Sequence, residues 1–192
     1  MRNPLYMPDM AAAEKAARYL EKCMEEKNSS GGIIECVIHG MPAGIGDPVF
    51  EKLNANLGKA ILSIGAVKGF EIGDGFLVST ATGLSNNDSY QADEQGNISK
   101  ITNHAGGITG GMSDGCDIIF RAAVKPTPSI AATQQTVNKS KENISINIKG
   151  RHDPVIVPRA VVVVESMAAL TVTDMLFSSM TSRMEDVIRF FM

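Results

Sequence analysis

The sequence has no tryptophan, and aromatic residues make up only 5% of its 192 residues. Surfaces that bind single-stranded nucleic acid stack bases on aromatic side chains, so this composition argues against such a surface. A net charge of −3 argues in the same direction, because proteins that coat nucleic acid are basic. We therefore expect no nucleic-acid partner, and any basic site must be local.

Cysteine is also scarce. Cys23, Cys36 and Cys116 are the only three, and no C-x-x-C spacing occurs. This speaks against a zinc site or a disulfide framework and fits a reducing compartment. We expect no bound metal, a cytoplasmic location and three buried thiols without a chemical role.

Targeting signals are missing as well. The first residues lack the long apolar core of a signal peptide. The most apolar stretch, residues 155–180, contains Arg159, Glu165 and Asp174. Charges inside a membrane span are unfavourable, so we predict a buried helix or strand–helix unit here and no membrane partner.

What is present is typical of a soluble globular chain, with 44% hydrophobic and 20% charged residues. The length allows one domain with a core, or two small ones. Asp9 is a good N-cap for an alanine-rich helix, and Asp47 and Pro48 are expected to start a second helix. A buried strand is expected at residues 33–39, further strands at 76–82 and 116–124, and a half-exposed strand at 142–148. Residues 86–100 are expected to form a mobile polar excursion.

Two stretches are rich in backbone or side-chain hydrogen-bond donors. Residues 102–115 hold five glycines, which suits a loop whose N–H groups face an anion. Neither the dinucleotide fingerprint nor the P-loop motif occurs there, so the phosphate inference is weak by itself. In Lys125–Ser129 two prolines hold Lys125, Thr127 and Ser129 in an extended segment, which fits a phosphate-bearing ligand or merely a stiff strand exit.

A charged loop is the most suggestive stretch. Arg151, His152 and Asp153 are consecutive, and Pro154 stiffens the backbone after them. Arginine binds phosphate or carboxylate, histidine can carry a proton near neutral pH, and aspartate can accept one. A charged surface turn with a local Arg–Asp pair explains the same residues.

Taken in order, these stretches resemble the chorismate synthase family. Six segments carry the resemblance, which covers nearly the whole chain: Gly46–Leu53, Ser63–Phe76, Asn103–Gly115, Lys125–Ser129, Gly150–Pro154 and Pro158–Ala160. It extends to the C-terminal half of the family only, because the motifs of the N-terminal half, including both catalytic histidines, do not occur here. We therefore expect residues 1–192 to be the C-terminal half of such a domain, with neither His104 nor His152 in the histidines' role.

The resemblance implies an α+β fold, a partial domain of a layered sandwich of antiparallel sheets and helices, assembled as a dimer of dimers. The family is a carbon–oxygen lyase of the shikimate pathway that converts 5-enolpyruvylshikimate 3-phosphate to chorismate and phosphate. The elimination is 1,4 and anti and needs reduced FMN without net redox change. Whether NADPH reduces the flavin on the protein stays open, and the isolated chain could instead be a non-catalytic flavin-binding or oligomerising fragment.

The resemblance also assigns site residues. Asp153 falls on an aspartate proposed to assist proton movement, and Arg159 on a position that helps to bind substrate anions. The expected FMN-binding positions are Gly65, Ala66, Gly110, Lys125, Pro126, Thr127, Pro128, Ser129 and Arg151.

Overall fold

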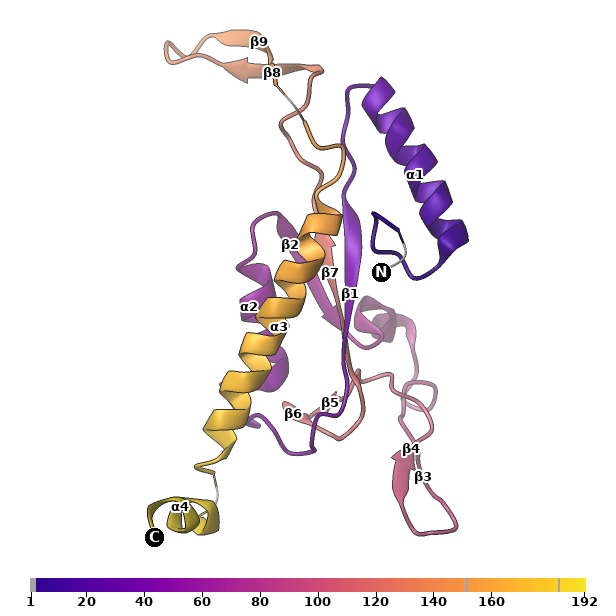
Figure 1. Ribbon diagram of the computed structural model, residues 1–192, viewed down its shortest axis with the longest axis vertical. Coiled ribbons are helices and arrows are strands. Elements are labelled where there is room, and N and C mark those ends of the chain that lie inside the picture. Colours follow the sequence, from indigo (N-terminus) through magenta and orange to yellow (C-terminus); the bar gives the residue numbers. More distant parts are fainter. Residues whose placement is uncertain (1–2, 151, 183) are drawn as a thin grey trace. The chain divides into compact units, whose positions relative to one another are not determined.

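A computed structural model describes residues 3–150, 152–182 and 184–192 (Figure 1). The chain divides into two compact units. Unit 1 comprises residues 1–33 and 123–162, and unit 2 comprises residues 34–122 and 163–192. Helices and short sheets alternate along the chain, which confirms the α+β class.

Unit 1 begins with helix α1 (Met10–Glu25). The Asp9 carboxylate accepts hydrogen bonds from the N–H groups of Ala11 and Ala12 at 2.8 and 3.2 Å, which confirms the predicted N-cap. The helix buries Ala13 and Cys23. Cys36 and Cys116 are only half-buried, so the prediction of three buried thiols is correct for Cys23 alone.

The other regular element wholly in unit 1 is a hairpin of β8 (Thr133–Val137) and β9 (Asn143–Asn147). The strands are antiparallel, with Gln135 opposite Ser145. All five residues of β9 are exposed, so the strand predicted at residues 142–148 is confirmed but its half-burial is not. Its partner β8 was not predicted.

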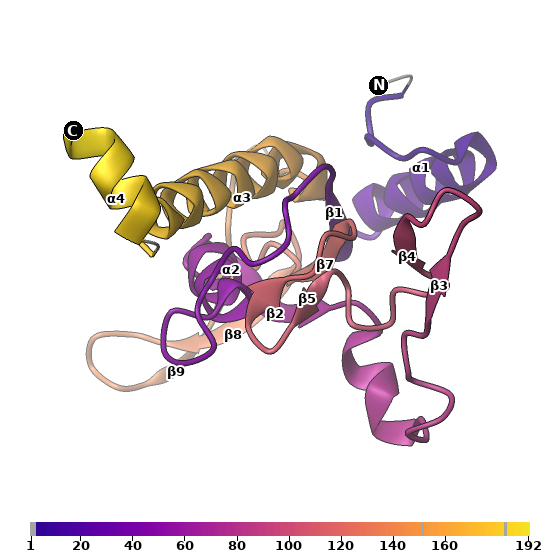
Figure 2. The ribbon, with the colours of Figure 1, turned by 90° about the horizontal axis from the view of Figure 1, so that it is seen from below.

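A three-stranded sheet of order β1-β7-β2 organises unit 2. Its strands are β1 (Gly32–Ile38), β7 (Ile118–Val124) and β2 (Val67–Ile72). Helix α2 (Leu53–Leu62) packs on β2, and Figure 2 shows α2 and α3 on the same face of the sheet. The largest fully buried side chains come from these elements: Phe120, Leu53, Leu57, Ile61, Ile118 and Val164.

Two predicted elements of unit 2 are wrong. The second helix begins at Leu53 instead of Asp47, because the chain takes a left-handed turn at Phe50, whose φ is +60°, before the helix can start. The strand expected at residues 76–82 is a 3₁₀ helix, η1 (Gly75–Thr80). Its apolar side chains suggested a strand, but they are exposed, with Phe76 at 81%.

The polar excursion at residues 86–100 contains regular structure that was not predicted. It contains an antiparallel hairpin of β3 (Tyr90–Ala92) and β4 (Ile98–Lys100). The Asp93 carboxylate closes its turn by accepting from the N–H of Gln95 at 2.9 Å and of Asn97 at 2.8 Å. A second, shorter hairpin joins β5 (Ile108–Thr109) to β6 (Met112–Ser113) inside the glycine-rich stretch.

The apolar stretch forms helix α3 (Val157–Ser179), followed by helix α4 (Met184–Phe191). The helix is confirmed, but its predicted burial is wrong, since only Val164, Ala168 and Met175 are buried. By length and composition α3 could cross a membrane, with a mean hydropathy of 1.7, but a core helix of a soluble protein passes the same test.

Candidate functional site

In unit 1 the Lys125–Ser129 segment leaves β7 and is held by residues that precede β1. The Ser29 hydroxyl donates to the carbonyl of Thr127 at 2.6 Å. Gly31 lies so close to this segment that an added Cβ would be 2.5 Å from the carbonyl oxygen of Val124 and 3.1 Å from Cδ of Pro126. Glycine is therefore required at position 31, where Pro126 packs closely against it.

Thr127 carries an unusual polar atom. Its Oγ1 is buried and has no hydrogen-bond partner among the residues that the structure describes. Buried hydroxyls are nearly always hydrogen-bonded, so an unpaired one needs an explanation. A ligand atom that reaches this hydroxyl would supply the missing partner.

The charged loop returns to the same part of unit 1. Ser30 donates its N–H to the carbonyl of Pro154 at 2.8 Å and forms an isolated parallel bridge with Val155. His152 lies with its Nδ1 3.3 Å from Oγ of Ser129. The Lys125–Ser129 segment and the loop after β9 are thus in direct contact, while Arg151 lies outside the described residues.

Asp153 and Arg159 form a two-bond ion pair. Nη1 of Arg159 lies 2.7 Å from Oδ2 of Asp153, and Nη2 lies 3.3 Å from Oδ1. The Arg159 side chain is 73% exposed and that of Asp153 is 32% exposed, so water screens the pair. The sequence-predicted catalytic and substrate-binding residues are therefore paired with each other here.

Unit 2 holds the other three expected cofactor positions. Gly65 and Ala66 connect α2 to β2, and Ala66 has φ +71°. That left-handed conformation is uncommon for a residue with a Cβ, and such strained positions occur often at ligand sites. A Cβ at Gly65 would meet nothing within 4 Å, so the backbone there is open.

Gly110 and Gly111 form the turn between β5 and β6, both with positive φ. A small open cleft of about 290 Å³ lies beside this turn. Its lining residues are Lys52, Asn54, Ile72, Ala105, Ile108, Gly110 and Gly111. Sequence reasoning missed Lys52, although it lies in the Gly46–Leu53 motif, because the predicted helix would have started before it.

Loop 40–46 is fastened to the same hairpin by a buried serine. Ser113, 4% exposed, donates its hydroxyl to the carbonyl of Pro42 at 2.6 Å and accepts the N–H of Ile45 at 2.9 Å. The N–H of Leu53 also bonds to the carbonyl of Gly111 at 2.8 Å. The glycine turn therefore has a fixed position within unit 2.

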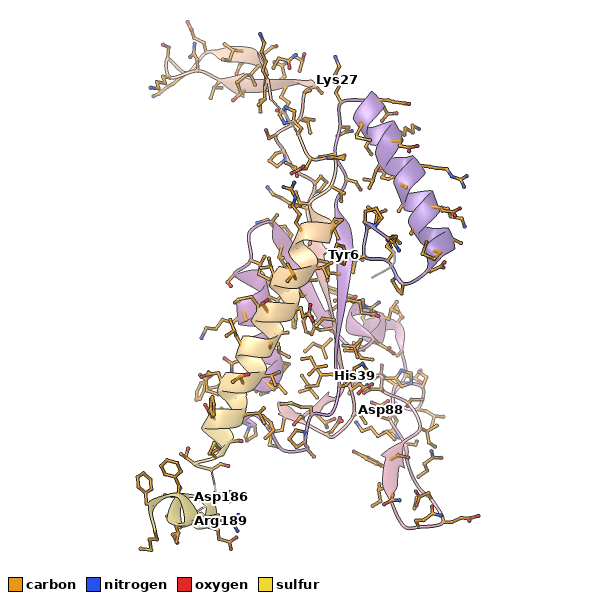
Figure 3. The ribbon with its side chains drawn as sticks, viewed as in Figure 1. Tyr6, Lys27, His39, Asp88, Asp186 and Arg189 are labelled. Atoms are coloured by element: carbon orange, nitrogen blue, oxygen red, sulfur yellow. The ribbon has the colours of Figure 1, made fainter. Side chains whose placement is uncertain are left out.

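A buried ionic cluster contacts the glycine-rich stretch. Nζ of Lys100 lies 2.5 Å from Asp114 and 3.8 Å from Asp88, which Figure 3 labels, and all three side chains are less than 10% exposed. Asp88 also accepts the N–H groups of His104 and Ala105, at 2.7 and 2.9 Å. The cluster therefore ties both hairpins to the first residues of the glycine-rich loop.

Hydrogen bonding decides the protonation of this cluster. Burial alone would raise the pKa of Asp88 and Asp114, but the hydrogen bonds they accept and the charge of Lys100 outweigh burial and hold each pKa below its usual value. Burial would lower the pKa of Lys100, but its bond to Asp114 raises it. All three groups are charged at neutral pH.

His104, whose N–H donates to Asp88 in the cluster, forms a pair with Asp74 through its side chain. Its Nδ1 is 2.7 Å from Oδ2 of Asp74, and the N–H of Asp74 donates to the carbonyl of His104 at 2.9 Å. Gly73 and Gly106 make the contact possible, since a Cβ at Gly73 would lie against the His104 carbonyl. His104 therefore serves as a hydrogen-bonding residue of this loop.

Across residues 3–150, 152–182 and 184–192, no three His, Cys, Asp or Glu side chains gather so that they could hold a metal ion.

The comparisons with known proteins all point to the same family. The family model described as chorismate synthase matches residues 1–177. The chorismate synthase of Agathobacter rectalis is 65% identical over 189 residues, which is 98% of this chain and 51% of that protein. That of Lachnoclostridium phytofermentans is 64% identical over 185 residues, or 96% and 50%.

A solved structure agrees. A crystal structure of chorismate synthase superposes with a TM-score of 0.71 at 28% identity and covers 93% of this chain and 46% of that one. The chain therefore spans about half the length of the curated relatives it matches.

Proposed function

Because the chain belongs to the chorismate synthase family, we propose that it supplies part of the active site for converting 5-enolpyruvylshikimate 3-phosphate to chorismate and phosphate. The observation that carries the proposal is the family match over residues 1–177. Residues 1–192 are then the C-terminal half of the domain, and the catalytic histidines of the family come from the other half. The proposed reaction is a step of the shikimate pathway and takes place in the cytoplasm.

The residues of unit 1 fit a phosphate-bearing cofactor such as FMN. The buried, unpaired Oγ1 of Thr127 needs a partner, and exposed Lys125 supplies a cation on the same rigid segment. Residues proposed to hold FMN in unit 1 are Lys125, Pro126, Thr127, Pro128, Ser129 and Arg151. When bound, reduced FMN supplies an electron to the substrate transiently and recovers it.

The expected FMN positions in unit 2 offer backbone groups within that unit. The open backbone at Gly65 and Ala66 and the glycine turn at Gly110 let a ligand approach closely. Lys52 at the cleft beside Gly110 adds a positive charge for an anionic group.

Asp153 and Arg159 act on substrate in this proposal. Arg159 is largely exposed and its pair with Asp153 is weak, so an incoming substrate anion can take the guanidinium. The carboxylate of Asp153 is then released from two hydrogen bonds and can accept a proton at Oδ1 or Oδ2. Substrate binding thereby frees the proton acceptor.

The same proposal explains why apolar residues of α3 are exposed. Val163, Leu170 and Phe177 recur every seven residues and are 43, 65 and 66% exposed. Such a row suits packing against another helix or a sheet. We propose that the complementary half of the domain covers it, and that completed domains assemble as a dimer of dimers.

The test is FMN binding in the presence of substrate, using this chain mixed with the N-terminal half of the Agathobacter rectalis relative. Saturable binding that is weakened about 3- to 10-fold by Thr127→Val supports the site, because that change removes one hydrogen bond. Absence of binding, with both halves shown to be folded and associated, contradicts it.

A further inference from the structure

The two ring nitrogens of His152 have different partners. Nε2 lies 3.1 Å from the carbonyl oxygen of Ile148, and Nδ1 lies 3.3 Å from the hydroxyl oxygen of Ser129. A carbonyl only accepts hydrogen bonds, so Nε2 must carry the proton. In the neutral ring Nδ1 is then an acceptor, an assignment that follows from the hydrogen-bond network.

This arrangement fixes the direction of the Ser129 hydroxyl. In the neutral ring Nδ1 can only accept, so Ser129 donates its single proton to His152. The lone pairs of Oγ remain available to other groups. Ser129 can therefore accept a hydrogen bond from a ligand but has no proton left to donate to one.

The surroundings hold both partners in place. Ser129 ends the rigid Lys125–Ser129 segment, which Ser29 fastens at Thr127. His152 lies next to the 154–155 segment that pairs with Ser30. The contact is long in sequence, at 23 residues, but both of its ends are tied to the same stretch before β1.

We propose that His152 is a positioning residue that makes Ser129 a hydrogen-bond acceptor for the flavin ring or the ribityl hydroxyls of FMN. The phosphate of FMN offers only acceptor oxygens, so Ser129 in this state does not serve it. The inference rests on the proposed function, which supplies FMN as the ligand. It gives Ser129 a different role from Lys125 and Arg151, whose cationic side chains suit the phosphate.

Three substitutions separate positioning from mere support. His152→Gln can still donate from its amide to the Ile148 carbonyl but loses the acceptor for Ser129. His152→Asn places its amide oxygen near the former Nδ1 and keeps that acceptor. Ser129→Ala removes the hydroxyl itself.

The experiment measures affinity for FMN and for riboflavin, which lacks the phosphate, in the assembly with the complementary half. We expect His152→Gln and Ser129→Ala each to weaken both ligands about 3- to 10-fold, the effect of one hydrogen bond. His152→Asn should stay within about 2-fold of wild type, and the double variant His152→Gln/Ser129→Ala should be no weaker than Ser129→Ala.

Several results overturn the proposal. One is wild-type affinity in His152→Gln when Ser129→Ala is weakened. Another is a Ser129→Ala defect seen with FMN but not with riboflavin, which would place the hydroxyl on the phosphate. Additive losses in the double variant would show that His152 acts independently of Ser129.

Nitrogen chemical shifts of His152 in the ligand-free chain test the geometry separately. We expect a protonated Nε2 and a bare Nδ1 whose shift changes in Ser129→Ala. A protonated Nδ1 refutes the inference whatever binds. If the His152 nitrogen shifts are as expected but no flavin binds to the assembly, the proposed cofactor is refuted. The proposed positioning role of His152 is then refuted as well.

Discussion

Replacing Lys100 by methionine tests how the glycine-rich loop is held. Methionine keeps most of the volume of the side chain but removes its charge. Asp88 and Asp114 then remain buried, at 7 and 8% exposure, without a cation between them. Removing one partner of a buried ion pair typically lowers stability by about 3–5 kcal/mol.

The structure places the effect at the lower end of that range. Asp88 keeps the N–H groups of His104 and Ala105, and Asp114 keeps the N–H of Cys116 at 3.1 Å. These bonds offset part of the lost pairing. We expect a loss of about 3 kcal/mol in the free energy of local opening, which is about a 10²-fold faster amide exchange.

The assay is hydrogen exchange of the His104, Ala105 and Cys116 amides. Lys68→Met is the matched control, because Lys68 lies exposed on β2 and the same change there should leave these amides as protected as in wild type. Equal protection in Lys100→Met and wild type would refute the view that the cluster orders the loop.

The pH dependence of the same difference has a definite sign. The pKa values of Asp88 and Asp114 are lowered on folding, so their stabilisation is complete above the unfolded pKa of about 3.9 and is lost as pH falls through the lower folded values. The pKa of Lys100 is raised, so its stabilisation persists until pH rises past about 10.4. The difference between wild type and Lys100→Met should be constant from about pH 5 to 9 and shrink in acid; a difference that grows below pH 4 would contradict this assignment.

Three further predictions concern other parts of the chain. In the assembly with the complementary half, Asp153→Asn should reduce turnover about 10²-fold and leave FMN affinity nearly unchanged, as measured by chorismate formation and flavin titration; unchanged turnover would remove Asp153 from the mechanism. Burial, and to a smaller extent the carboxylate of Glu165, raises the pKa of Cys36 from 9.0 to about 11. At pH 8 its alkylation, followed by mass spectrometry, should therefore be about 100-fold slower than that of an ordinary thiol. Alkylation at the ordinary rate would argue against the burial of this thiol. Leu170→Lys should weaken association with the complementary half, measured by analytical ultracentrifugation, whereas Lys59→Met on α2 serves as a control that should not; equal association in both would show that α3 is not the contact.

Local signals in the sequence predicted some elements well. Asp9 caps α1 through its own side chain, which needs no information from elsewhere in the chain. The helical spacing of Val49, Leu53, Leu57, Ile61 and Ile64 predicts a buried helix face. Leu53, Leu57 and Ile61 are fully buried on α2, whereas Val49 precedes the helix and is 59% exposed. Short-range patterns of this kind depend only on the geometry of one element.

Elements that depend on turns or tertiary contacts were harder to predict. Phe50 adopts positive φ, which propensity does not anticipate, and so the start of α2 was misplaced. The burial of Lys100 depends on Asp88 and Asp114 from two other segments, and its polar neighbourhood in sequence gave no sign of it. The exposure of α3 could not be inferred either, because hydrophobicity indicates what a helix prefers to contact and not whether the contact is present.

The candidate site shows the same division. Family motifs placed Lys125–Ser129 and Asp153 in one site, and the structure adds the contacts that motifs do not show. The bond between Ser129 and His152 joins residues 23 positions apart, and the pair of Asp153 with Arg159 depends on the first turn of α3. The resemblance predicts the site positions, and the structure shows which of their side chains contact one another.

The most direct measurement is anaerobic turnover of 5-enolpyruvylshikimate 3-phosphate with photoreduced FMN, by this chain alone and by its mixture with the N-terminal half of the Agathobacter rectalis relative. We predict chorismate from the mixture and none from the chain alone, because the proposed site needs residues from both halves. Chorismate from the chain alone would contradict the divided site, and none from a folded, associated mixture would contradict the proposed activity.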